Sequence, residues 1–295
     1  MLSVVTLVSP TALAALDDVL LRRVARSLPE VRQPVWLDEN IAADVIFAEP
    51  VTPAILAQVR DALGGRPIDF FVQPMALRRK RLLVADMDST MIEQECLDEL
   101  ADFAGLKAHI AAITARAMRG DIPFEPALRE RVALLKGLDA GVIGQIIAER
   151  ISLTPGAQTL VRTMRAHGAF TVLVTGGFTA FTQDIAPRIG FDAHVANVLG
   201  IANGRLNGKI EEPILGRAAK CEVLERYRRE RGLSASETLA IGDGANDLDM
   251  LAEAGLGVAF HAKPTVAAAA QARVDHGDLT ALLYAQGYRR ADFVA

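Results

Sequence analysis

The chain has 295 residues and 51% hydrophobic content, enough for two ordinary domains with sizeable cores. Its 32 basic and 36 acidic residues give a formal net charge of −4, so it lacks the overall basic field of nucleic-acid-binding proteins, and no DNA or RNA partner is expected. No apolar run approaches the roughly 20 residues of a membrane-spanning helix, and two distant cysteines provide neither a disulfide framework nor a zinc site.

The first 76 residues alternate between strand-like and helix-like segments. "SVVTLVS", "AADVIFAE" and "IDFFVQP" have the composition of strands, whereas "LDDVLLRRVARSL" and "TPAILAQVRDALGG" have the apolar spacing of helices. The opening stretch is a poor signal peptide, because no basic residue precedes its apolar part, a proline interrupts it, and Asp17 and Asp18 follow it. We predict a small α+β domain over residues 1–76 and, from the sparse cysteines, a cytoplasmic location.

Residues 77–295 show the pattern of a parallel α/β sheet. After the basic run "RRKR", which we interpret as an exposed linker, buried-type strands recur as "LLVAD", "FTVLVT", "TLAIGD" and "GVAF", each followed by a helical pattern. Residues 93 to about 150 hold four helix-like stretches and no strand, which predicts a helical cap inserted over the site. Residues 197–210 carry Asn and Gly turn signals and predict a hairpin.

Three of these strands end in polar residues. Ligands of parallel sheets bind beyond the carboxyl ends of the strands, so these residues are expected to face one crevice. Singly they are weak signals, since Asp and Thr cap helices and Gly pairs form turns, but their combination is more specific. The residues concerned are Asp86, Asp88, Thr175, Gly176, Gly177, Asp243, Asn246 and Asp247.

The acidic residues of this group call for a cation. Asp86, Asp88, Asp243 and Asp247 would raise one another's pKa if no positive charge lay among them. Carboxylate oxygens without nearby His or Cys ligands favour Mg²⁺, which takes one or two protein carboxylates together with waters and substrate oxygens. Lys220 is a plausible second cation.

The remaining polar residues favour phosphate chemistry. A Gly176–Gly177 turn that opens a helix would offer backbone N–H groups to an anion, and Thr175 would add a hydroxyl donor. An aspartate is the most available nucleophile in this chain, and carboxylates do form aspartyl-phosphates. Asp86 is suited to attack phosphorus, while Asp88 can protonate the leaving oxygen and later activate water.

Together "DMDST", "TGGF", Lys220 and "GDGANDLDM" resemble the haloacid-dehalogenase superfamily. Longer segments, among them "DMDSTMIEQECLDELA", "RAMRGDIPFEPALRERVALLKG" and "AGLGVAFHAKP", resemble its phosphoserine phosphatase family over most of residues 82–275. The resemblance implies a Rossmann-like parallel sheet with a helical cap insertion. It also implies Mg²⁺-dependent hydrolysis of O-phospho-L-serine to L-serine and phosphate through an aspartyl-phosphate, the last step of serine biosynthesis.

The resemblance also implies roles for individual residues. Asp86 would be the phosphorylated nucleophile and a Mg²⁺ ligand, and Asp88 would be the acid/base and offer its backbone carbonyl to the metal. Asp243 would complete the protein ligands, with Asp247 in support. The residues expected to bind phosphate or substrate are Thr175, Gly176, Lys220 and Asn246.

The cap would recognise the amino-acid part of the substrate. The resemblance implies that Glu95 binds the substrate ammonium, that Arg131 binds its carboxylate and that Phe124 closes over the substrate. The planar guanidinium of an arginine can bind a carboxylate through two hydrogen bonds. Each residue alone has a plainer interpretation: Glu95 as a helix-dipole partner, Arg131 as a surface ion-pair member and Phe124 as core. Thr175 stands where the family often has Ser, and we expect activity to survive this change.

Alternatives stay open at this point. The same site could act on another small phosphate ester, such as phosphohomoserine or a sugar phosphate. A regulatory binding protein with Asp86 as a phosphorylated switch is the third interpretation, although Asp88 argues against it. The N-terminal segment resembles ACT-like domains weakly, and its role as a serine sensor, as the surface of a homodimer or as a mere support is open.

Overall fold

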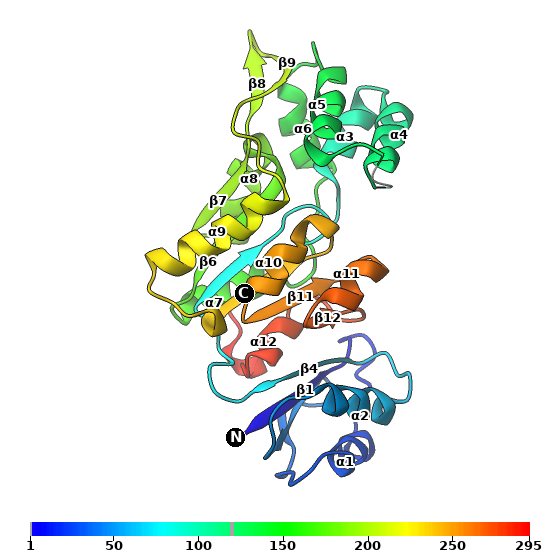
Figure 1. Ribbon diagram of the computed structural model, residues 1–295, viewed down its shortest axis with the longest axis vertical. Coiled ribbons are helices and arrows are strands. Elements are labelled where there is room, and N and C mark those ends of the chain that lie inside the picture. Colours follow the sequence, from blue (N-terminus) through cyan, green and yellow to red (C-terminus); the bar gives the residue numbers. More distant parts are fainter. Residues whose placement is uncertain (1, 119–120) are drawn as a thin grey trace.

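The computed structural model describes residues 2–118 and 121–295, so Arg119 and Gly120 of the "RAMRGD" segment lie outside the described residues. Figure 1 shows the secondary structure stacked along one long axis, with a group of helices at one end, a parallel sheet in the middle and the N-terminal sheet at the other end. Among the described residues, no helix combines the length and apolar character needed to cross a membrane.

The N-terminal sheet is antiparallel, has the order β2-β3-β1-β4 and carries two helices on one face. Its elements are β1 (Ser3–Val8), α1 (Asp18–Arg26), β2 (Val35–Asp38), β3 (Ala42–Phe47), α2 (Pro53–Leu63) and β4 (Asp69–Pro74). Local signals start both helices, since the side chains of Asp17 and Thr52 accept hydrogen bonds from backbone N–H groups of the first turn. The predicted small α+β fold is confirmed, but strand β2 was missing from the prediction.

The larger sheet is parallel throughout and has the order β12-β11-β10-β5-β6-β7. Its strands are β5 (Leu82–Ala85), β6 (Phe170–Phe178), β7 (Ala193–Asn197), β10 (Thr238–Gly242), β11 (Leu256–Phe260) and β12 (Ala272–Val274). Along β5, Leu82 and Val84 enter one hydrophobic cluster, whereas Leu83 and Ala85 enter another. Because both faces are covered, the central strands are continuous apolar runs, and the predicted parallel α/β sheet is confirmed.

Helices cover both faces of this sheet. One cluster holds apolar residues of α9 (Arg217–Glu230), α10 (Leu248–Glu253) and α11 (Pro264–Ala269). The opposite cluster holds apolar residues of α7 (Ala157–Ala166), α8 (Thr179–Ile189) and α12 (Ala281–Ala285). Helix α12 also packs against β1 and β4, so it lies between the two sheets and covers the second face of the N-terminal one (Figure 1).

The predicted cap helices are confirmed. They are α3 (Cys96–Phe103), α4 (Lys107–Met118), α5 (Phe124–Leu134) and α6 (Gly141–Glu149), inserted between β5 and α7. The predicted hairpin is formed by β8 (Leu199–Ala202) and β9 (Arg205–Ile210), and β9 packs against α5 of the cap. The division into domains 1–76 and 77–295, with a cap at about 93–150, stays a prediction.

Candidate active site

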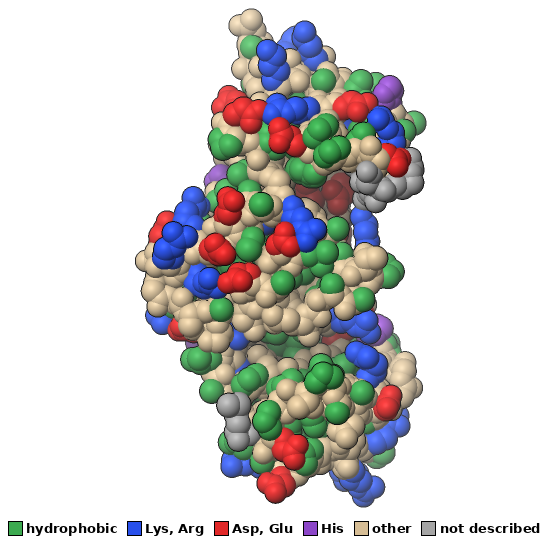
Figure 2. All heavy atoms as spheres, in the orientation of Figure 1, with side chains coloured by type: hydrophobic (Ala, Val, Ile, Leu, Met, Phe, Trp, Pro, Cys, Tyr) green, Lys and Arg blue, Asp and Glu red, His purple; other side chains and the backbone are tan. Residues whose placement is uncertain are grey.

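The candidate site lies at the carboxyl ends of three adjacent strands. Strand β5 lies between β10 and β6, so the chain leaves β5 toward one side of the sheet and later returns to its other side. Such a switch of direction opens a crevice beyond the strand ends. Asp86 follows β5 directly, Asp243 follows β10 directly, and Thr175 lies near the end of β6. Figure 2 shows a hollow between the cap helices and the sheet with acidic side chains inside it.

Three carboxylates converge in this crevice. Asp86, Asp243 and Asp247 each offer an oxygen, and these oxygens all lie within 4.8 Å of one another. Thr90 Oγ1 donates to Asp243 Oδ1 at 3.2 Å, and the backbone N–H of Gly244 donates to Asp247 Oδ2 at 3.0 Å. The predicted proximity of Asp86 and Asp243 is confirmed, and Asp247 joins them.

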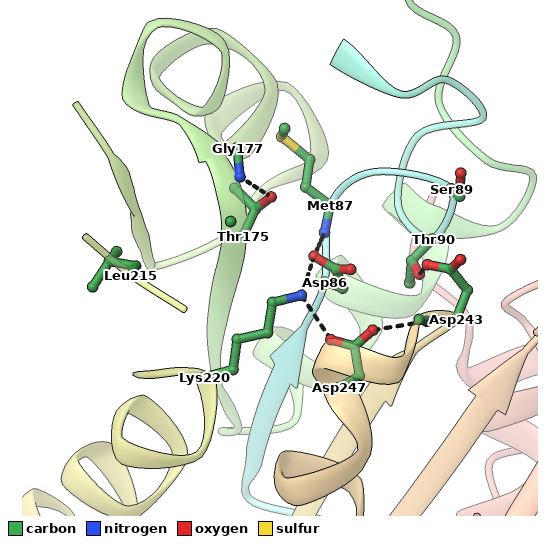
Figure 3. A network of polar contacts seen from close by, with 12 residues as sticks. Asp86, Met87, Ser89, Thr90, Thr175, Gly177, Leu215, Lys220, Asp243 and Asp247 are labelled. Atoms are coloured by element: carbon green, nitrogen blue, oxygen red, sulfur yellow. Dashed lines mark hydrogen bonds and ion pairs between the residues drawn. The ribbon is translucent and has the colours of Figure 1, made fainter. Parts of the chain in front are cut away.

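Lys220 is a cation in direct contact with this group. Its Nζ lies 2.8 Å from Asp86 Oδ1 and 2.7 Å from Asp247 Oδ1 (Figure 3). Burial disfavours the charged amine, but the two carboxylates outweigh it and raise the pKa of Lys220. The pKa of Asp86 is raised well above its usual range by burial and by the charge of Asp247, and Lys220 offsets part of this effect.

The residues present fit a divalent cation. One lysine faces three carboxylates, and burial followed by the charges of Asp247 and Glu95 raises the pKa of Asp243 to about 6. The raised pKa values of Asp86 and Asp243, caused first by burial and then by the charge of Asp247, mean that the lysine compensates their charge only in part when no ion is bound. Oxygen ligands alone, without His or Cys among them, match the preference of Mg²⁺.

Asp88 has a different environment from the three converging carboxylates. Its Oδ1 is buried and has no hydrogen-bond partner among the described residues. Burial, then the charge of Glu95, raises the pKa of Asp88 to about 7, against opposing effects of Cys96 and Lys220. A carboxyl group that titrates near neutral pH can both give and take a proton, which suits an acid/base.

The phosphate-binding prediction is wrong in one detail. Gly176 and Gly177 do not form a turn that opens a helix; they lie in the last residues of β6, and α8 begins only at Thr179. The strand continues because it pairs again with β7 at Phe178, after a register irregularity. The backbone N–H of Gly177 donates to Thr175 Oγ1 at 2.8 Å (Figure 3), which leaves the Thr175 hydroxyl proton for another acceptor.

The predicted amino-acid-binding residues lie in and beside the cap. Glu95 precedes α3 and accepts a hydrogen bond from Ser89 Oγ at 2.8 Å. Arg131 lies in α5, where burial lowers its pKa and the charges of Asp98 and Glu95 act in the opposite direction. Glu95 and Arg131 carry opposite charges and lie close enough to influence each other.

Phe124 links the cap to the strand ends. It begins α5 and is 36% exposed, so it is not the core residue of the plainer interpretation. A Cβ atom built on Gly176 would meet its ring at 3.2 Å, which shows how closely the ring approaches the end of β6. Asn246 lies half-buried in the short 3-10 helix Ala245–Asp247 beside the carboxylates, and its contact with substrate stays a prediction.

One contact was missing from the sequence interpretation, and one residue was given too small a role. Asp247 was placed in the crevice only in support of Asp243, whereas its carboxylate joins those of Asp86 and Asp243. Thr90 had no role, and its hydrogen bond to Asp243 joins loops 153 residues apart. Nothing in the local sequence marks such a contact.

Comparison with known proteins agrees with this geometry. The model of the family described as haloacid dehalogenase-like hydrolase matches residues 83–252. A phosphoserine phosphatase of Streptomyces coelicolor is 43% identical over 258 residues, which cover 87% of this chain and 62% of the relative. A phosphoserine phosphatase of Albidiferax ferrireducens is 44% identical over 224 residues, which cover 74% of this chain and 94% of the relative.

A solved structure extends the likeness to the N-terminal sheet. The crystal structure of a HAD family hydrolase of Salmonella enterica serovar Typhi superposes with a TM-score of 0.84 at 29% identity, covering 96% of this chain and 97% of the other. The chain spans less than two thirds of the Streptomyces relative but nearly all of the Albidiferax one. Sequence, fold and site geometry agree, and the chain belongs to the haloacid dehalogenase-like hydrolase family.

Proposed function

We propose that this protein is a Mg²⁺-dependent phosphatase that hydrolyses O-phospho-L-serine to L-serine and phosphate, the last step of serine biosynthesis, in the cytoplasm. One observation carries the chemistry: Asp86 is buried at the tip of β5, 2.8 Å from the Lys220 amine and within 4.8 Å of two further carboxylates. The relatives named phosphoserine phosphatase support the choice of substrate.

The reaction needs two displacements at phosphorus. A carboxylate oxygen of Asp86 attacks, the bond from phosphorus to the serine oxygen breaks, and Asp88 gives its proton to that oxygen. Asp88 then takes a proton from water, whose oxygen attacks the aspartyl-phosphate, releasing phosphate and restoring Asp86. Burial raises the pKa of Asp88 to about 7 before an ion binds, which suits a group that both gives and takes a proton. Lys220 would balance charge on the phosphoryl oxygens.

The metal would be held by side-chain oxygens of Asp86 and Asp243 and the backbone carbonyl of Asp88, with Asp247 beside them. When bound, Mg²⁺ would neutralise the carboxylates and part of the phosphate charge. The local geometry supports this assignment, because the oxygens of Asp86, Asp243 and Asp247 lie within reach of one ion.

The cap supplies the proposed selectivity for an amino acid. Glu95 would bind the substrate ammonium, and Arg131 would bind its carboxylate through paired N–H donors. Phe124 would cover the substrate from α5, since its ring already lies against Gly176. Thr175, Gly176 and Lys220 would hold the phosphate, and Asn246 would approach it from the loop after β10.

Phosphate release from a panel of esters tests the proposal. The panel holds O-phospho-L-serine, phosphohomoserine, sugar phosphates and p-nitrophenyl phosphate, each with and without Mg²⁺. We expect phosphoserine to be the preferred substrate, no release without the metal, and none from Asp86→Asn. A preference for a sugar phosphate would reject phosphoserine as the substrate but would leave the proposed phosphatase mechanism standing.

A phosphorylated-switch role predicts a different outcome. In that case the aspartyl-phosphate would persist for minutes, whereas an acid/base at Asp88 makes its hydrolysis fast. Acid quenching after mixing with phosphoserine, followed by intact-mass measurement, separates the two. Accumulation of a stable phosphorylated chain without phosphate release would favour the switch.

A further inference from the structure

Asn197 is a buried residue outside the catalytic groups. It is the last residue of β7 and only 1% exposed. Its side-chain Nδ2 donates to the carbonyl of Gly176 at 2.8 Å and to the carbonyl of Leu215 at 3.3 Å, while its Oδ1 accepts from the backbone N–H of Leu215 at 2.7 Å. One amide therefore joins two backbone segments, the end of β6 and the loop before α9.

The first of these segments orients a phosphate donor. The peptide between Gly176 and Gly177 is trans, so its carbonyl and its N–H point in opposite directions. Asn197 holds the carbonyl, and the N–H on the other side donates to Thr175 Oγ1 at 2.8 Å. Because that oxygen already accepts one hydrogen bond, its hydroxyl proton is directed to another acceptor. Asn197 thus sets the direction of the Thr175 donor through one peptide plane.

The second segment leads to the lysine. Leu215 precedes α9, whose buried Lys220 contacts Asp86, and Figure 3 shows Leu215 and Thr175 on neighbouring segments beside Lys220. The cap ring rests on the same two segments: a Cβ built on Gly176 would lie 3.2 Å, and one built on Gly216 3.8 Å, from the ring of Phe124. The parts that would surround a phosphate are tied together at Asn197.

We propose that Asn197 is a positioning residue for phosphate: it fixes the Thr175 donor relative to Lys220 without touching the substrate. This inference rests on the proposed phosphatase chemistry but not on serine as the substrate. It predicts that loss of the amide weakens recognition of the phosphate group common to all substrates and leaves the preference among them unchanged.

The variant Asn197→Asp tests this directly. It keeps the size of the side chain and the acceptor for Leu215, but it sets a carboxylate oxygen against the carbonyls of Gly176 and Leu215. We expect kcat/KM to fall about 10- to 100-fold, because a small displacement of a positioned donor is costly. The fall in kcat/KM should be equal for phosphoserine and p-nitrophenyl phosphate, and the inhibition constant of inorganic phosphate should rise.

Thr182→Val is the matched control. Thr182 lies in α8 and shares a partly buried hydrogen bond of 2.8 Å with His194 of β7, so its loss disturbs the same neighbourhood without reaching Gly176 or Leu215. We expect a comparable fall in melting temperature and an unchanged inhibition constant of phosphate. Similar effects of both variants on phosphate inhibition would assign Asn197 a purely structural role and overturn the proposal.

A second variant is needed in case Asn197→Asp does not fold. Asn197→Ser replaces the amide with a hydroxyl and is too short to span both segments, so it carries the same expectation. Failure of both variants to fold would make Asn197 a core residue and overturn the proposal. An unchanged inhibition constant of phosphate in either folded variant would also overturn the proposal. If wild type ignores phosphoserine but cleaves p-nitrophenyl phosphate, the substrate assignment fails while the Asn197 comparison still stands.

Discussion

Lys220 Nζ lies 2.8 Å from Asp86 Oδ1, and both side chains are buried beneath the crevice at the strand ends. The amine offsets part of the burial and of the Asp247 repulsion that raise the pKa of Asp86. Among the described residues, Lys220 and the backbone N–H of Met87 therefore support the negative charge of the proposed nucleophile until a metal ion binds. Removing the amine would act on the nucleophile as well as on bound phosphate.

We expect Lys220→Met to lower kcat/KM about 100- to 1000-fold, the usual effect of losing one positioned group that stabilises charge in the transition state. Lys220→Arg keeps the charge but brings a bulky planar group between two carboxylates, so its activity should lie between wild type and Lys220→Met. Steady-state phosphate release at saturating Mg²⁺ measures both. Near-wild-type activity of Lys220→Met would remove the lysine from the site.

Asp247→Asn should change metal affinity and stability in opposite directions. The carboxylate shares the cluster with Asp86 and Asp243, so its neutralisation should weaken Mg²⁺ binding about 10- to 100-fold. Asp247 also raises the pKa of Asp86, hence the ion-free variant should melt at a higher temperature than ion-free wild type. Calorimetric titration with Mg²⁺ and thermal unfolding in a chelator check the two parts. Unchanged Mg²⁺ affinity would show that Asp247 plays no part in holding the ion.

Stabilisation by Mg²⁺ should grow with pH. Burial raises the pKa of Asp243 to about 6 and that of Asp88 to about 7, both above the usual 3.8. The folded protein therefore holds these protons more tightly than the unfolded chain, so their contribution to stability is present at low pH and is lost as the pH rises through 6 to 7. Melting curves with and without Mg²⁺ at matched ionic strength should diverge from about pH 5 to about pH 8. If Mg²⁺ raised the melting temperature equally at the low-pH and high-pH ends of this range, the carboxylate cluster would not be short of positive charge.

Much of the architecture was predictable because buried strands require apolar residues, which form a recognisable pattern in the sequence. The central strands β5, β6, β10 and β11 are covered on both faces and appear as apolar runs. The strands that were missed, β2, β7 and β12, all lie at sheet edges. Their burial is mixed, so no continuous run or clean alternation reveals them.

The candidate site was predictable to the extent that its residues follow strand ends. Asp86 and Asp243 could be placed together because the strands before them are parallel neighbours. Asn197 could not be placed, since it binds backbone atoms of Gly176 and Leu215, which any sequence would offer. Contacts to backbone from distant segments depend on the assembled fold and leave no local pattern.

Arg131→Ala should separate amino-acid recognition from phosphate chemistry. We expect kcat/KM on phosphoserine to fall about 100-fold, because hydrogen bonds between charged groups are lost, while p-nitrophenyl phosphate changes little. Arg129→Ala is the control on the same helix: Arg129 pairs with Glu125 and Glu212 on the surface, and its loss should leave activity on both substrates unchanged. Equal losses on both substrates in Arg131→Ala would assign that arginine to cap structure.

Asp69 should anchor the N-terminal sheet to the parallel one. Its Oδ1 accepts from the backbone N–H of Asp275 at 2.8 Å, and its Oδ2 accepts from that of Gly277 at 2.7 Å. Asp69→Asn turns an amide against one of these donors, so we expect a loss of about 1 to 3 kcal/mol, because buried N–H groups are left unpaired. Urea unfolding measures it, with Asp184→Asn as control, since that carboxylate pairs with Arg188 on the exposed surface of α8. Equal stability of both variants would show that α12 and the apolar contacts hold the sheets together without Asp69.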